Sequence, residues 1–197
     1  MTQYSVGILL FNEVEVLDFA GPFEVFSLAT ISETNDKAFS VHTLSEDGEM
    51  ITARNGLKVQ PDFSFANHPA VDLVIIPGGY GAEVVEIHNE RVITWIKQQA
   101  TQVEIVASVC TGALLLAKAG ILDGLQATTH WMDLDRLERE FPSVSVQRNR
   151  KFVDEGAIIT SGGISAGINM SFHVVSKLCG KQVALETAKR MEYDIEL

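Results

Sequence analysis

The stretch from residue 103 to residue 120 constrains the fold more than any other part of the sequence. It starts as a short apolar run rich in β-branched residues, which is typical of a buried parallel strand. From Cys110-Thr111-Gly112 it changes to the Leu and Ala spacing of a helix that ends at Gly120. A cysteine therefore lies where a strand turns sharply into a helix. This is the arrangement of a nucleophile elbow, in which a small residue two positions further on, here Gly112, lets the helix pack closely.

Cys110 is the candidate nucleophile. The N-terminus of a helix carries unpaired N–H groups and a partial positive charge, so we expect it to favour the thiolate over the thiol. The alternative is that Cys110 is a small buried apolar residue, which is the commoner role of a free cysteine. The second cysteine, Cys179, lies near the end of an apolar helical stretch and is interpreted as core.

Composition narrows the class of protein. A chain of 197 residues, 46% of them hydrophobic, suits one domain over residues 1–197 with a substantial core. A net charge of −11 argues against a nucleic-acid surface, which needs clustered Lys and Arg. Without a basic N-terminal region or an apolar run of about 18 residues, we expect a cytoplasmic protein with no membrane contact. The two cysteines form no Cys-x-x-Cys pair and lie at no metal-ligand spacing from histidine, so neither a disulfide framework, a metal nor a cofactor is expected.

Strand and helix patterns alternate along the whole chain. Strands are predicted at 4–11, 39–45, 72–76, 103–109 and 157–160, with short strands at 144–146 and 151–153, and helices at 89–101, 112–120, 132–141, 164–178 and 181–193. Residues 50–65 are predicted to hold short extended pieces, with Asn55-Gly56 as a turn. This alternation predicts an α/β fold: a doubly wound, mostly parallel sheet in a three-layer α/β/α sandwich of flavodoxin-like type.

An unusual sequence follows the first predicted strand. Residues 14–29 have a helical apolar pattern, but Pro22 lies inside it. We expect Pro22 either to start the helix or to kink it, which leaves 14–21 as a connection from the strand. Asp18 then lies at the carboxyl end of the first strand, where open α/β sheets bind their ligands. The alternative role for Asp18 is a helix cap.

Two further segments end at the same predicted edge of the sheet. Pro77-Gly-Gly-Tyr-Gly81 follows a strand, and its glycines permit close approach of the backbone to a ligand. It lacks the spacing and the following helix of a dinucleotide site, so we expect no phosphate role. His130 ends the segment 127–131 and could face the site of Cys110. The alternative is a histidine whose ring is satisfied by the backbone.

We predict that three large apolar side chains pack in the core, those of Trp95, Trp131 and Met170. Trp131 has a second interpretation, because it follows His130 and is therefore also a candidate for lining a substrate pocket.

Five stretches of the sequence resemble the DJ-1/PfpI (ThiJ) family of the class I glutamine amidotransferase-like fold. They are Ile-Pro-Gly-Gly (76–79), Ser-Val-Cys-Thr-Gly-Ala (108–113), Gly-Ile-Leu-Asp-Gly (120–124), Ala-Thr-Thr-His-Trp (127–131) and Thr-Ser-Gly-Gly-Ile-Ser-Ala-Gly-Ile (160–168). The likeness runs from about Val6 to the last helix. Within the family the chain looks most like the isonitrile hydratases and the amidase-like domains of AraC-type regulators. Asp18 stands where DJ-1 proteins carry glutamate, and Thr111 where the PfpI proteases carry histidine.

The resemblance implies hydration of an isonitrile, as a small-molecule substrate, to an N-substituted formamide. Cys110 is then the nucleophile and Asp18 acts first as acid and later as base. The N–H groups of Thr111 and Gly79 are expected to hold negative charge. The Thr111 hydroxyl and His130 are secondary contacts to substrate or water. The resemblance also implies a homodimer.

Other functions of the Cys110 thiol are also consistent with the sequence. The thiol also suits a DJ-1-like cysteine stress or redox protein, and a glyoxalase-like or amidase-like hydrolase. The sequence ends at Leu197 without room for a helix-turn-helix module, so DNA binding is not expected. Asn169 stands where the relatives usually carry aspartate, which bears on the transfer of function if that carboxylate tunes the site.

Overall fold

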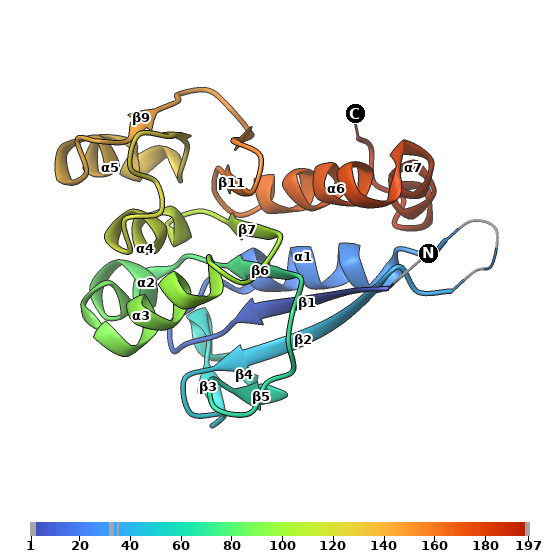
Figure 1. Cartoon of the computed structure of the whole chain (residues 1–197), viewed down its shortest axis with the longest axis horizontal. Coiled ribbons are helices and arrows are strands. Elements are labelled where there is room, and N and C mark those ends of the chain that lie inside the picture. Colours follow the sequence, from blue (N-terminus) through green and yellow to red (C-terminus); the bar gives the residue numbers. More distant parts are fainter. Residues whose placement is uncertain (1–2, 32–33, 35, 196–197) are drawn as a thin grey trace.

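A mostly parallel β-sheet forms the centre of the molecule (Figure 1). The structure is a computed structural model that describes residues 3–31, 34 and 36–195, and within them the central sheet has seven strands in the order β10-β11-β7-β6-β1-β2-β5. The strands are β1 Tyr4–Leu9, β2 Phe39–Ser45, β5 Phe63–Ser64, β6 Leu73–Ile76, β7 Ile105–Ser108, β10 Phe152–Asp154 and β11 Ile158–Ser161. Neighbours are parallel except β10, which is antiparallel to β11. The predicted fold class is thereby confirmed.

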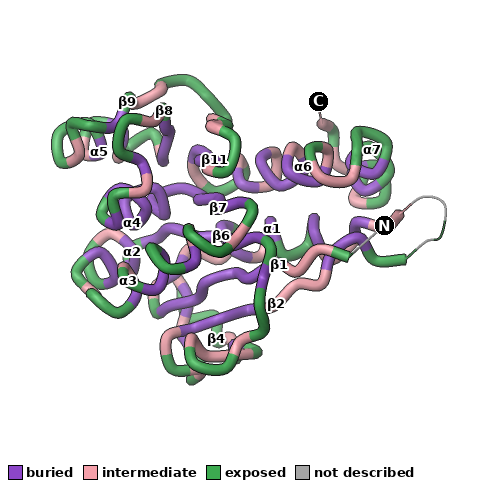
Figure 2. Tube along the Cα trace, in the orientation of Figure 1, coloured by how far each residue is buried: buried purple, intermediate pink, exposed green. Residues whose placement is uncertain are grey.

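The central strands are buried on both faces. Every residue of β6 and β7 is buried, which is why these strands appear in the sequence as continuous apolar runs rather than as alternating patterns (Figure 2). In their register Ile76 lies opposite Ser108. The two strands therefore end side by side, and the glycine segment after β6 comes next to the cysteine after β7.

Helices cover both faces of the sheet (Figure 1). One layer contains α1 Val16–Leu28, α6 Ala166–Cys179 and α7 Lys181–Arg190, and the other contains α2 Tyr80–Val84, α3 Glu90–Gln99 and α4 Gly112–Lys118. A smaller unit at one end holds α5 Leu134–Glu140 with the strand pair β8 Gln126–Ala127 and β9 Ser145–Val146. None of the described helices is long and apolar enough to cross a membrane.

The segment after β2 forms a small hairpin. β3 Ile51–Thr52 pairs antiparallel with β4 Lys58–Val59, and the chain reverses through the 3-10 turn Arg54–Gly56. Asn55 and Gly56 have φ values of 60° and 90°, the left-handed conformation that this dipeptide adopts readily. The predicted turn is confirmed.

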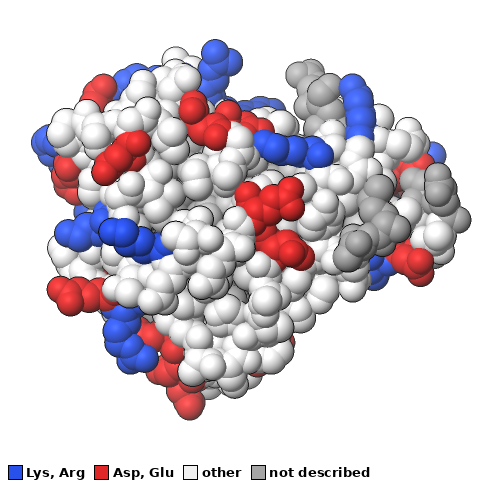
Figure 3. Space-filling view, in the orientation of Figure 1, with Lys and Arg blue, Asp and Glu red and all other residues white. Residues whose placement is uncertain are grey.

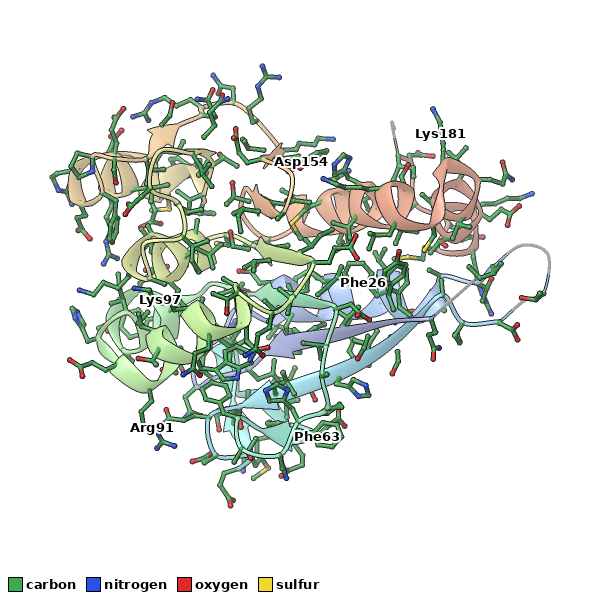
Figure 4. All side chains as sticks on the ribbon, viewed as in Figure 1. Phe26, Phe63, Arg91, Lys97, Asp154 and Lys181 are labelled. Carbon is green, nitrogen blue, oxygen red and sulfur yellow. The ribbon has the colours of Figure 1, made fainter. Side chains whose placement is uncertain are left out.

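Pro22 does not start the helix, and the predicted connection over residues 14–21 was wrong. Helix α1 starts at Val16 and continues through Pro22 to Leu28. An interior proline costs about 3 kcal/mol, because it removes one hydrogen bond and crowds the preceding turn. Here the helix buries an apolar face on the sheet, including Val25 and the fully buried Phe26 labelled in Figure 4, and such packing outweighs local propensity. Asp18 consequently lies in the first turn of α1 and not in an irregular connection.

A second difference follows β6. No helix was expected after the glycine segment, but α2 begins at Tyr80 with Gly79 as its N-cap. The helix has five residues and no strong apolar periodicity, so the sequence pattern carried little signal for it.

Contacts at the edge strand attach it to the helix layer. Asp154 on β10, labelled in Figure 4, accepts from His173 Nε2 at 2.7 Å and from Lys177 Nζ at 2.9 Å, both on α6.

Over the molecular face drawn in Figure 3, acidic and basic side chains are interspersed, with wide uncharged areas between them.

Candidate active site

The elbow at Cys110 is built by close contact between two strand ends. Cys110 has φ 56°, a left-handed conformation that is uncommon for a residue with a side chain. Its N–H donates to Gly162 O at 3.2 Å, which ties the elbow to the end of β11. A Cβ at Gly112 would lie 2.1 Å from Ile76 O. Glycine at 112 is therefore needed for α4 to start this close to the end of β6, as the sequence predicted.

The glycine segment holds two site residues through consecutive amides. Gly78 N–H donates to Asp18 Oδ2 at 3.0 Å, and Gly79 N–H donates to Thr111 Oγ1 at 2.9 Å. A Cβ at Gly78 would lie 2.4 Å from the Thr111 backbone nitrogen. The structure thus brings Asp18, Gly79 and Thr111 together. The Gly79 N–H is already engaged by the Thr111 hydroxyl in this arrangement.

Asp18 is completely buried, and half of its carboxyl group is unpaired. Oδ2 accepts from Gly78, whereas Oδ1 makes no hydrogen bond. Burial raises the pKa of Asp18 from 3.8 to about 7, and the negative charge of Glu15 adds to the effect, while the hydrogen bond from Gly78 opposes it. The Cys110 thiol and the Ile164 N–H also lie close enough to lower this pKa. Asp18 does not cap its own helix, so the capping alternative fails.

The expectation of a stabilised thiolate was wrong. Burial raises the pKa of the Cys110 thiol well above its ordinary value, and the negative charge of Asp18 raises it further. The Thr111 N–H at the start of α4 acts in the predicted direction and lowers the pKa of the thiol, but its effect is smaller than that of burial. The side chain is 6% exposed. The resting site therefore holds a neutral thiol beside a carboxyl group that titrates near neutrality.

His130 borders the site without bonding to the thiol. Its Nδ1 accepts from Met132 N–H at 3.4 Å and lies 3.8 Å from Asp133 Oδ2. In the described part of the chain no hydrogen bond joins the His130 ring to Cys110. The neighbouring Thr129 hydroxyl donates to Cys110 O at 2.8 Å, so the segment is anchored to the elbow. The backbone-satisfied histidine is thus the arrangement in the structure, and His130 remains a secondary candidate.

The packing interpretation of Trp131 was wrong. Its side chain is 74% exposed, because it starts a short 3-10 turn, Trp131–Asp133, on the surface. Trp95 and Met170 are buried as predicted. Cys179 is half-buried against the core, in agreement with its interpretation.

Two residues near the site were not found from the sequence. Glu83, on α2, lies close enough for its negative charge to contribute to the raised pKa of Cys110. Ile164 has φ 54°, which is an outlier for a β-branched residue, and it presents its N–H toward Asp18. The signal for Ile164 was the Gly162-Gly163 pair before it. Glu83 had no signal, because the helix that carries it was not predicted.

The side chain of Asn169 is hydrogen-bonded outside the elbow. Its Oδ1 accepts from the Tyr193 hydroxyl at 3.4 Å, which links α6 to the segment after α7.

Among the residues that the structure describes, no group of three or more His, Cys, Asp or Glu side chains is placed to hold a metal ion.

Comparisons with known proteins agree with this architecture. The DJ-1/PfpI family model matches residues 4–177. Isonitrile hydratase of Pseudomonas putida is 34% identical over 190 residues, which are 96% of this chain and 78% of that protein. The HTH-type transcriptional regulator GbdR of Pseudomonas aeruginosa is 32% identical over 190 residues, 96% of this chain and 51% of the regulator. This chain therefore spans about half the length of that regulator, and the expectation that it binds no nucleic acid stays a prediction.

A solved structure gives the same fold. The crystal structure of a ThiJ/PfpI family protein from Pseudomonas syringae matches with a TM-score of 0.88 at 23% identity, over 100% of this chain and 78% of that one.

Proposed function

Because the chain belongs to the DJ-1/PfpI family, we propose that it is an enzyme that hydrates an isonitrile to an N-substituted formamide. Asp18 carries the proposal: it is a fully buried carboxyl group with one oxygen unpaired and a pKa of about 7, near enough to the Cys110 thiol for the two groups to affect each other's pKa. A carboxyl group with a pKa near neutrality can both donate and accept a proton at physiological pH. Hydration needs one group with both abilities.

The first half of the reaction forms a covalent bond to sulfur. The terminal carbon of an isonitrile carries a lone pair and becomes electrophilic once it is protonated. Asp18 in its acid form donates a proton to this carbon, and the Cys110 sulfur bonds to the same carbon while the thiol proton passes to the Asp18 carboxylate. S–H has then been added across the carbon, the product is a thioimidate, and Asp18 is again protonated.

The second half uses water. Asp18 gives its proton to the nitrogen of the thioimidate and takes one from the attacking water, so a tetrahedral adduct forms. The carbon–sulfur bond then breaks, the hydroxyl proton of the adduct returns to Cys110, and the formamide leaves. Both protons of the water are accounted for: one replaces the proton that Asp18 gave to nitrogen, and the other returns to the Cys110 sulfur.

The raised pKa of the Cys110 thiol favours these hydration steps over a redox role. A cysteine sensor needs an accessible thiolate at neutral pH, and Cys110 is buried with its pKa raised. In the hydratase the thiol loses its proton only as the bond to carbon forms. The Thr111 N–H, which faces the sulfur, stabilises the negative charge that develops there.

The test is turnover of a simple alkyl isonitrile by the purified protein, followed as formation of the N-substituted formamide. We expect turnover by the wild type and its loss in Cys110→Ala and Asp18→Asn. Cys179→Ala is the matched control, because this second cysteine packs against the core away from the elbow, and it should keep activity. A folded wild type that forms no formamide refutes the proposal.

A further inference from the structure

His68 is a half-buried histidine that the proposed function does not use. It follows β5, the last strand at one edge of the sheet, and its ring meets the Trp95 ring of α3 edge to face. The indole Nε1–H of Trp95 donates to His68 Nε2 at 3.2 Å, and His68 Nδ1 lies 2.7 Å from Pro69 O. Both nitrogens of the imidazole ring therefore have a hydrogen-bond partner.

These two partners fix which nitrogen of His68 carries the proton. An indole nitrogen can only donate a hydrogen bond, and a carbonyl oxygen can only accept one. His68 Nε2 must therefore be the nitrogen without a proton, and Nδ1 must carry the proton that it donates to Pro69 O. The neutral ring with its proton on Nδ1 is the one form that satisfies both contacts.

Protonation of His68 would break one of these bonds and keep the other. A charged imidazole has two N–H groups and no acceptor. Its Nε2–H would face the Trp95 indole N–H, so two donors would meet with no lone pair between them. The Nδ1–H bond to Pro69 O survives and becomes charge-assisted. The break therefore falls between the chain around His68 and α3.

The bond from Trp95 closes an aromatic contact at the edge of the sheet. Phe65 stacks on Trp95 with ring centroids 4.4 Å apart and ring planes 3° from parallel, and Trp95 is only 5% exposed. The Phe65 N–H donates to Ser45 O at 3.1 Å, so the same segment also covers the outer edge of β2. Separation of this segment from α3 would expose the aromatic pair and the edge of the strand.

Charged groups around the contact give a proton on His68 no bonded partner. The groove beside Trp95 is lined by the charged residues Glu46, Glu90 and Arg91. Glu46 is paired with Arg91, and Asp62, on the segment of His68 itself, accepts from a β2 amide. Among the residues that the structure describes, none of these carboxylates forms a hydrogen bond or an ion pair with His68. A proton on His68 would thus cost the indole bond without gaining an ion pair.

We propose that His68 and Trp95 form a pH-sensitive clasp that is closed while His68 is neutral and opens when His68 is protonated. The clasp holds residues 63–69 against α3. Because the closed form binds one proton fewer than the open form, it should weaken as the pH falls through the range in which histidines titrate, between about pH 8 and pH 5. The clasp uses no residue of the proposed active site and does not depend on the hydratase function.

Nitrogen NMR of the wild type tests the closed form directly. At about pH 8, long-range proton–nitrogen correlation of the imidazole rings should show the His68 proton on Nδ1 and a bare Nε2. A proton on Nε2 would overturn the inference, because that form cannot accept from the indole. This measurement needs no variant, so it stays decisive whatever a substitution at His68 does to folding.

The opening can be followed at the indole N–H of Trp95. Its resonance should shift between about pH 8 and pH 5 in the wild type, and at the lower pH its hydrogen exchange should be about tenfold faster than in His68→Gln, the change that corresponds to one hydrogen bond. The glutamine amide oxygen can accept from the indole at every pH, so the shift should be absent in His68→Gln. An equal shift in both proteins would contradict the clasp.

Two further variants make the assignment specific. His88→Gln removes another histidine, at the end of the 3-10 turn that precedes α3, and should keep the wild-type shift. Trp131→Phe leaves Trp95 as the single tryptophan, so the fluorescence emission should move to longer wavelength on acidification as the ring becomes exposed. That movement should disappear when His68→Gln is added. Its persistence there, or loss of the shift in His88→Gln, would assign the pH response to another group.

Discussion

Replacement of Asp18 by asparagine should change how stability depends on pH. The pKa of Asp18 is about 7 in the folded protein against 3.8 ordinarily. Below pH 3.8 the carboxyl group is protonated in both states and costs nothing. As pH rises toward 7 it ionises in the unfolded state but stays protonated in the folded state, so the free energy of unfolding falls by about 1.4 kcal/mol per pH unit. Above pH 7 the loss is complete.

Asparagine does not titrate, so it lacks this loss. From pH 5.5 to pH 7 the wild type should lose about 2 kcal/mol relative to Asp18→Asn. The comparison between two pH values cancels the pH-independent cost of the asparagine amide, whose N–H groups would face the place of the unpaired Oδ1.

The measurement is urea unfolding of both proteins at intervals from pH 5.5 to pH 8, above the sequence pI of about 4.8. Cys110→Ala is the control: it alters the neighbour of Asp18 but keeps the carboxyl group, whose pKa is raised first by burial, so its curve should run parallel to that of the wild type. Parallel curves for Asp18→Asn and wild type would refute a raised pKa at Asp18, and with it the acid role.

Three further predictions follow from the same geometry. Iodoacetamide should alkylate Cys110 slowly at neutral pH, and in Asp18→Asn the pH profile of alkylation should move to lower pH, because the charge of Asp18 helps to raise the thiol pKa. Gly112→Ala should lower the free energy of unfolding by about 3 kcal/mol in a denaturant titration, since its Cβ would lie 2.1 Å from Ile76 O. Asn169→Asp should leave formamide production within about twofold of wild type, as expected of a substitution outside the site; a larger effect would show that this position tunes the chemistry.

Local patterns in the sequence determined the order of elements and the position of the elbow. Continuous apolar runs predicted the buried parallel strands, and a cysteine followed two residues later by glycine predicted the sharp turn into α4. These features depend on neighbours in the chain, so they can be recognised without knowing what packs against them. The sequence and its family resemblance also singled out Asp18, Gly79 and Thr111, which the structure brings together.

What the tertiary structure decided depends on contacts between distant segments. Pro22 stays inside α1 because the helix face is buried, which outweighs a local cost. The direction of the Cys110 pKa was decided by burial and by Asp18, 92 positions earlier in the chain, and not by the adjacent helix N-terminus. Glu83 comes near the site only because Gly79 starts the helix α2 that carries it. Desolvation and charge act through space. A local pattern is therefore a better guide to which residues come together than to which of them carry a proton.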